Sequence, residues 1–170
     1  MRFSGIRPPS LTTQFVVGAA SEKDADIIKA THSLYKNFSM SRVFYSAFRP
    51  VCGTPLEERP AESLTREHRL YQADFLMRFY RFKPYDIPVK EDGSLENDVD
   101  PKMAWAKQHP EFFPINLNSA DYWTLIKVPG LGPESAKKII KLRKQSRLKS
   151  LDQLEGQRIQ INKAIEFACC

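Results

Sequence analysis

Residues 128–133 read Val-Pro-Gly-Leu-Gly-Pro and lie between two stretches with helical apolar spacing. The two glycines, one residue apart, let the backbone turn tightly, because φ > 0 is open to both. Pro133 then suits the first position of the next helix, where no amide hydrogen bond is missed. A helix N-terminus has unpaired amides and a partial positive charge, so it can hold a phosphate. The spacing therefore predicts a short hairpin that grips a phosphate backbone.

The segments on either side of this hairpin are predicted to be helices. The first covers residues 118–127, with Asn118 as its N-cap and Leu125 on its buried face. The second covers residues 133–147, and Ala136 is small where the two helices must come close. Its basic residues are Lys137, Lys138, Lys141, Arg143, Lys144 and Arg147. A basic run is usually a solvated face, but its place after such a hairpin favours contact with nucleic acid.

Composition agrees with a basic, folded chain. The 170 residues have a formal net charge of +6, and 42% are hydrophobic, which excludes a wholly disordered chain. A positive charge suits polyanionic partners, although many basic proteins bind none. Cys52, Cys169 and Cys170 lack CxxC spacing, which argues against a zinc site or a disulfide framework. With no signal-peptide core and no apolar run of membrane length, we expect a cytoplasmic protein without a membrane partner.

The N-terminal half begins with the pattern strand, helix, strand. The strands are predicted at residues 14–17 and 43–48, and the helix at 24–37, with Ser21 as its cap. This is a βαβ unit, which implies a parallel pair covered by its helix. Two parallel strands are too few for a self-sufficient core, so the unit would pair with another chain or borrow the C-terminal helices. A helix predicted at residues 65–82 interleaves arginines and aromatics, which could stack on bases or form a solvated face of a packed helix.

These patterns divide the chain into three parts. Residues 1–83 form the first domain, and residues 84–110 form a linker that ends in a short helix. The linker is highly charged with few large apolar residues, so a mobile segment is expected. Residues 111–170 form the second domain. The predicted fold class is α+β, mostly α.

Residues 148–167 look like a degenerate second copy of the hairpin pattern. Ser150 would cap a short helix, and Gly156 stands where the second hairpin would turn. The paired glycine is missing, because Gln157 and Arg158 follow. We expect this copy to support a pseudo-symmetric four-helix packing and to bind phosphate poorly.

Residues 125–139 resemble the helix–hairpin–helix family of DNA-binding motifs. They fit its apolar-x-x-apolar-Pro-Gly-apolar-Gly core, and residues 115–120 are similar to its competence-protein branch. The resemblance implies contact with the DNA backbone regardless of sequence, with salt-sensitive affinity on the order of 10⁻⁴–10⁻⁶ M. The DNA-binding residues it implies are Val128, Pro129, Gly130, Leu131, Gly132, Glu134, Ser135, Lys137, Lys138 and Lys141.

The same resemblance implies two backbone contacts in detail. Amides of Gly130, Gly132, Glu134 and Ser135 would face phosphate oxygens. In some family members a monovalent cation lies under the hairpin on backbone carbonyls, and the matching residues here are Ile126, Val128 and Leu131. The alternative for the whole motif is a scaffold that contacts protein instead of DNA.

The remainder of the chain resembles the C-terminal part of radical S-adenosylmethionine proteins of DNA modification and repair. The matching segments are residues 12–20, the YSxFxPxxGTP-like segment 45–55, and residues 66–74 and 100–106. The resemblance implies that residues 1–83 are the remnant of a (β/α) barrel. It also implies a uracil-DNA-glycosylase-like protein as a partner.

One part of that family pattern is missing, which bears on catalysis. The family's iron–sulfur cluster needs a CxxxCxxC loop, and this sequence has none. We therefore expect no catalytic residue and no cofactor in this chain; cluster and S-adenosylmethionine would enter only with a partner that supplies the other barrel half. Three hypotheses stay open: a DNA-associating fragment or subunit, a subunit that completes a split enzyme, and a docking scaffold for the glycosylase-like partner.

Overall fold

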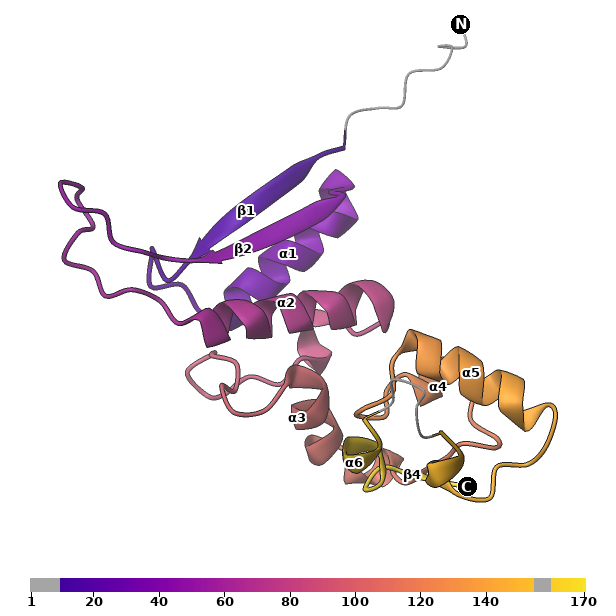
Figure 1. Cartoon of the computed structure of the whole chain (residues 1–170). Helices are drawn as coiled ribbons and strands as arrows, with labels where there is room; N and C mark the ends of the chain where they lie inside the picture. The colour runs from indigo at the N-terminus through magenta and orange to yellow at the C-terminus, as the bar shows by residue number, and fades with distance from the viewer. Residues whose placement is uncertain (1–9, 155–159) are drawn as a thin grey trace, which may run out of the picture.

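The computed structural model describes residues 10–154 and 160–170, and its first three elements form the predicted βαβ unit. Strand β1 (Thr12–Val17) pairs in parallel with β2 (Arg42–Ala47), and α1 (Asp24–Phe38) connects them (Figure 1). The predicted Ser21 cap is wrong: α1 begins after Lys23, which makes no side-chain cap. The Ser21 backbone has a φ of 59°, and its hydroxyl accepts a hydrogen bond from Arg59.

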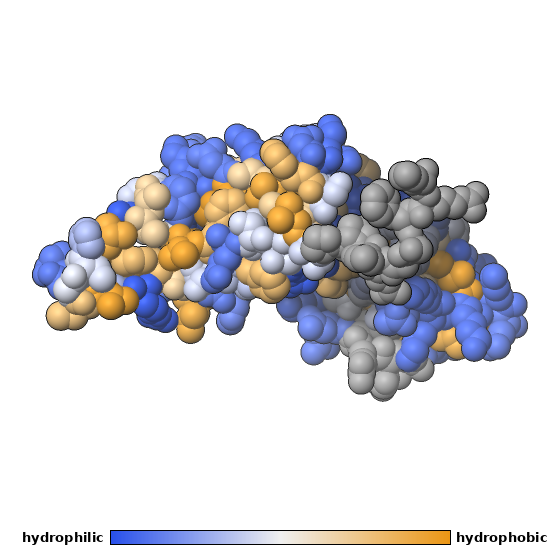
Figure 2. All heavy atoms as spheres, turned by 90° about the horizontal axis from the view of Figure 1, so that it is seen from above, coloured by the Kyte–Doolittle hydropathy of each residue, from blue (hydrophilic) through white to orange (hydrophobic). Residues whose placement is uncertain are grey.

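One face of this sheet is covered and the other is open. The Tyr45 hydroxyl, on the covered face, shares a 2.9 Å hydrogen bond with Thr31 of α1. On the same face α2 (Leu64–Phe79) packs on β2, and its Tyr71 hydroxyl accepts from the Tyr45 amide at 3.0 Å. On the open face Val16 and Phe44 are 51% and 43% exposed. Figure 2 shows apolar side chains gathered over the sheet half of the molecule, while the C-terminal half is mostly hydrophilic on that side.

The segment expected to be a mobile linker is instead held against α1 and α2, so that expectation is wrong. The buried Asp24 carboxylate accepts from the Leu95 amide at 2.8 Å and from Arg66 Nε at 2.7 Å. Ile87 and Leu95 are both 3% exposed. A 3-10 turn, η1 (Pro84–Asp86), lies in this segment, and α3 (Pro101–Gln108) forms where a short helix was predicted, capped by Asp100.

The C-terminal part consists of short elements. They are η2 (Pro110–Phe112), β3 (Ile115–Asn116), α4 (Tyr122–Leu125), α5 (Pro133–Arg143), η3 (Leu151–Leu154), α6 (Ile161–Ala164) and β4 (Ala168–Cys169). β3 and β4 pair in parallel and join the two ends of this part. The fold is thus α+β, mostly α, with two small sheets.

Both predicted helices around the hairpin are shorter than expected, and the predicted cap of the first is wrong. Asp121 caps α4, accepting from the Thr124 amide at 2.7 Å. The Asn118 side chain instead bonds both backbone groups of Leu148, each at 2.9 Å. It therefore ties the start of the motif to the chain that leaves α5. The predicted second hairpin at Gly156 lies outside the described residues.

A continuous apolar core joins the two halves. It runs from Val17 in β1 through Trp105 in α3 to Ala168 in β4. The Trp105 ring packs edge-on to Phe113, whose ring meets Phe167 edge-on at 5.0 Å. No helix in the described ranges is both long and apolar enough to cross a bilayer.

Candidate functional site

The hairpin between α4 and α5 turns on one left-handed residue instead of two. Gly130 has a φ of 80°, whereas Gly132 is extended at φ −107° and ψ 179°. The Leu131 amide closes the turn on the Val128 carbonyl at 3.1 Å. Gly132 is then the N-cap of α5, and Pro133 occupies its first turn as predicted.

Gly130 is also the point where the hairpin rests on α6. Its carbonyl accepts from the Gln160 amide at 3.2 Å. A Cβ on Gly130 would lie 2.5 Å from the Gln160 carbonyl oxygen and 3.3 Å from the Ala164 nitrogen, both backbone atoms. The hairpin therefore needs glycine here for close approach as well as for its φ.

Four backbone amides at the hairpin tip were predicted to face phosphate. Those of Gly130 and Gly132 make no backbone hydrogen bond within residues 10–154 and 160–170. Those of Glu134 and Ser135 belong to the first turn of α5, where helix geometry offers no partner. Glu134 is exposed, whereas Ser135 is only 4% exposed. The accessible part of this positive helix end therefore lies at Glu134, which is exposed, and at Gly132, which is half-buried.

The other predicted site residues separate into buried and exposed groups. Ile126, Val128, Pro129 and Leu131 are buried, so only their backbone is available to a ligand. On α5, Lys137, Lys138 and Lys141 are exposed, as is Lys144, the C-cap residue that follows the helix.

Three charged side chains of α5 are already engaged. Lys137 pairs with Glu134 at 2.8 Å, and this hydrogen bond lowers the pKa of Glu134 and raises that of Lys137. Arg143 does not belong to the solvated basic face. Its guanidinium donates to the carbonyls of Leu117 and Ala120, at 2.9 and 2.6 Å. It therefore anchors the end of α5 to the loop before α4.

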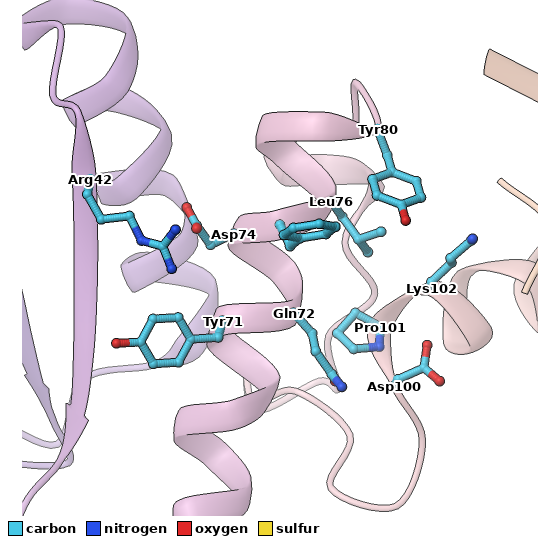
Figure 3. A pocket seen from close by; sticks show the side chains of 10 residues that line it. Arg42, Tyr71, Gln72, Asp74, Leu76, Tyr80, Asp100, Pro101 and Lys102 are labelled. Carbon is cyan, nitrogen blue, oxygen red and sulfur yellow. The ribbon is translucent and has the colours of Figure 1, made fainter. Parts of the chain in front are cut away.

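Sequence reasoning missed Lys102, a residue of α3 that reaches the hairpin. Its ammonium donates to the Leu131 carbonyl at 2.5 Å and lies 4.9 Å from the centre of the Tyr80 ring (Figure 3). Loss of water lowers the pKa of this ammonium to about 7, while the Asp100 carboxylate opposes the shift. The contact spans 29 residues of sequence and joins two halves that were treated separately, so no local pattern could have indicated it.

The Lys102 contact has an electrical consequence for Gly132. In a trans peptide the C=O and N–H point in opposite directions, so the ammonium on the Leu131 carbonyl lies behind the Gly132 amide. A charge on the carbonyl polarises the peptide and makes its N–H a stronger donor. Lys102 thus makes the Gly132 amide a stronger donor to a ligand.

The carbonyls predicted to hold a monovalent cation do not fit one well. Val128 already accepts from the Leu131 amide, and Leu131 accepts from the Lys102 ammonium. A metal cation on this set would lie next to a positive charge, which repels it. Within the described ranges, no group of three or more His, Cys, Asp or Glu side chains is placed to hold a metal ion. The cation site stays a prediction that this arrangement does not favour.

The comparison with known families bears on this same region. A family model described as helix-hairpin-helix motif matches residues 112–159. No curated protein and no solved structure matches the chain. Helix–hairpin–helix motifs are commonly associated with DNA binding that does not depend on sequence. The match therefore covers the hairpin, α4 and α5, and does not extend into the N-terminal half.

Proposed function

We propose that this chain binds duplex DNA through its phosphate backbone, without reading the base sequence. The observation that carries the proposal is the tip of the hairpin, where the Gly132 amide makes no backbone hydrogen bond to any described residue at the N-terminus of an 11-residue helix. A phosphate oxygen is the natural acceptor for such a group. The helix–hairpin–helix match supports the same ligand.

The charges around the hairpin suit a polyanion. Lys138 and Lys141 are exposed on the helix that follows the tip. Lys102 places a further ammonium behind the Gly132 peptide. Each contact to phosphate releases a counterion, so the affinity should fall steeply with salt. With a few such contacts the Kd should be on the order of 10⁻⁴–10⁻⁶ M at physiological salt.

The substitution Gly132→Asp tests the proposal with little risk to the fold. A Cβ at Gly132 meets only the Tyr80 hydroxyl, at 3.7 Å, and the backbone there is one that any residue adopts. Aspartate is a favoured N-cap, so α5 should be as stable or more stable. Its carboxylate would cover the free amides and repel phosphate.

Fluorescence anisotropy with a labelled blunt duplex at low salt measures the effect. We expect Gly132→Asp to weaken binding at least about tenfold, a conservative figure for one lost charge-assisted contact plus repulsion. Gly132→Ala, the matched control, should bind nearly as wild type does. Equal binding by the aspartate and alanine variants would refute a role for the hairpin tip.

The wider setting that we propose is the back half of a radical S-adenosylmethionine protein of DNA modification or repair, in the cytoplasm. A second candidate function, completing a split enzyme of that kind, is favoured by the β1–β2 sheet. In the part of the chain that the structure describes, that sheet has two parallel strands and leaves Val16 and Phe44 exposed. Parallel sheets are normally covered on both faces.

Anaerobic co-expression with a segment that carries CxxxCxxC tests this second candidate. A brown, iron-containing complex that co-purifies would support it, and its absence would count against it. A complex with a glycosylase-like protein that survives high salt would instead support the scaffold hypothesis, since phosphate contacts weaken with salt.

A further inference from the structure

A groove of about 450 Å³ crosses the outer side of α2, between β2 and α3 (Figure 3). Helix α2 and its C-cap Tyr80 line it with the aromatic and apolar side chains of Tyr71, Phe75, Leu76 and Tyr80 and with the polar ones of Gln72 and Asp74. Phe75 is 46% exposed, and its ring leans on that of Tyr80 at 5.7 Å. Positions 71 and 80 are about 14 Å apart along a helix that rises about 1.5 Å per residue. The groove is thus long enough for more than one planar group.

Each end of the groove has a basic side chain. Arg42 of β2 points toward α2, and its Nε is buried without a hydrogen-bond partner among the described residues. Its guanidinium carbon lies 5.9 Å from the centre of the Tyr71 ring. At the other end is Lys102. A buried donor without an acceptor is costly, which points to a ligand that supplies one.

The two carboxylates in the groove are already engaged. Asp74 accepts from the Tyr35 hydroxyl at 2.8 Å and from Arg78 at 3.3 Å. Asp100 accepts from the Met103 amide at the start of α3, and its other oxygen faces Lys163 at 3.5 Å. These acids have partners of their own, whereas the Arg42 Nε has none. An anionic ligand is therefore favoured over a cationic one.

The groove is continuous with the hairpin. Lys102 lines the groove while its ammonium contacts the Leu131 carbonyl. Tyr80 lines it as well, and its hydroxyl is 3.7 Å from where a Gly132 Cβ would lie. A strand held at the hairpin tip would thus reach the groove by passing Tyr80.

We propose that this groove binds a short single-stranded segment of the DNA whose duplex part is held by the hairpin. Bases stack on Tyr71 and Phe75, and Arg42 donates to a phosphate or a base edge at the far end. The chemistry is that of single-strand grooves, which combine cationic contacts with aromatic stacking. The inference rests on the proposed function for the duplex part, because the hairpin positions the strand.

Duplexes with and without a single-stranded overhang distinguish the two sites. The full chain is titrated by anisotropy with a blunt duplex, the same duplex with a short 3′ or 5′ overhang, and the overhang sequence alone. We expect one overhang polarity to bind at least about fivefold tighter than the blunt duplex, as one stacked base provides. A 2-aminopurine base in that overhang should lose fluorescence on binding.

Variants of the groove should remove this advantage and leave blunt-duplex binding unchanged. These variants are Phe75→Ala and Arg42→Gln. The matched controls are Tyr85→Ala, an aromatic residue 85% exposed outside the groove, and Arg49→Gln, an exposed arginine after β2. The controls should bind every probe as wild type does.

The outcomes separate the groove from the hairpin. Equal affinity for blunt and overhang duplexes in a chain that binds DNA overturns the groove and leaves the hairpin intact. An equal loss in the control variants overturns it too. Binding to the single strand alone, with no binding to blunt duplex, supports the groove and refutes the hairpin. Binding to none of the probes refutes both.

Discussion

The helices that follow the two hairpin patterns begin in opposite ways. Helix α5 has 11 residues, and the Gly132 amide at its start makes no backbone hydrogen bond to the residues that the structure describes. Helix α6 has four residues, and the Gln160 amide at its start donates a hydrogen bond to the Gly130 carbonyl. The first helix thus keeps its positive end open to a ligand, while the second uses its N-terminal end to hold the first hairpin in place. The first unit thus offers its helix end to the proposed ligand, and the second braces the first.

The contact between the two units can be broken at Gly130. Gly130→Ala combines a left-handed backbone with a Cβ that would lie 2.5 Å from the Gln160 carbonyl oxygen. We expect the unfolding free energy to fall by about 3 kcal/mol. Backbone strain of the left-handed alanine contributes about 1–2 kcal/mol, and overpacking against Gln160 contributes a similar amount. Chemical denaturation followed by circular dichroism measures it.

Gly132→Ala is the control for this change, because its Cβ has room and its backbone is extended. It should shift the unfolding free energy by less than about 0.5 kcal/mol. If the two alanine variants were equally stable, α6 would not be a brace.

The next largest effect should come from Arg143, at the opposite end of α5. Its two hydrogen bonds to the carbonyls of Leu117 and Ala120 are charge-assisted. Arg143→Ala should therefore cost about 2 kcal/mol of unfolding free energy. Lys144→Ala, which removes an exposed charge from the next position, should cost almost nothing. Comparable losses in both variants would mean that Arg143 is one more surface charge.

Local patterns predicted the elements whose determinants lie close together in sequence. The βαβ unit, α3 and the Pro133 helix start were all confirmed. The βαβ unit follows from alternating apolar runs, and the Pro133 start follows from the absence of an amide hydrogen at proline. Such features need no knowledge of what packs against them.

The features that sequence reasoning missed depend on partners far along the chain. Asparagine is a common N-cap residue, yet the side-chain amide of Asn118 donates to the carbonyl of Leu148, 30 residues away. The acidic segment was predicted to be mobile from its composition. In the structure its Leu95 amide donates to the Asp24 carboxylate, 71 residues away, and this contact holds the segment in place. Lys102 lies at the hairpin only because α3 packs beneath it. Tertiary contacts of this kind override local propensity, and a single sequence does not display them.

Protonation of Lys102 should make duplex binding by the hairpin depend on pH. Its ammonium, with a pKa of about 7, faces the Asp100 carboxylate, the Tyr80 ring and the Leu131 carbonyl. The charged form strengthens the Gly132 amide and attracts phosphate, so duplex affinity should fall by a few-fold as pH rises from 6 to 8. Lys102→Met should remove this part of the pH dependence in anisotropy titrations. The difference between the two chains isolates Lys102, because they are identical at every other position.

The stability of the fold should depend on pH with the opposite sign. The folded-state pKa of Lys102 lies below its ordinary value of 10.5. Between about pH 7 and 10 the unfolded chain therefore binds more protons than the folded chain, and the unfolding free energy rises with pH. A loss of affinity toward pH 8 would thus accompany a more stable chain. Parallel losses of affinity and stability would contradict this role for Lys102.

The smallest effect compares lysines on the two helices. Lys138 and Lys141 are exposed on α5, and Lys163 is 49% exposed on α6, where it faces Asp100. Substituting either α5 lysine with alanine should lower the slope of log K against log salt by about one unit, which corresponds to one phosphate contact. Lys163→Ala should leave the slope unchanged, because its helix braces the hairpin and its charge is paired. If Lys163→Ala also lowered the salt slope by one unit, Lys163 would contact a phosphate too, and the DNA would then lie over both α5 and α6.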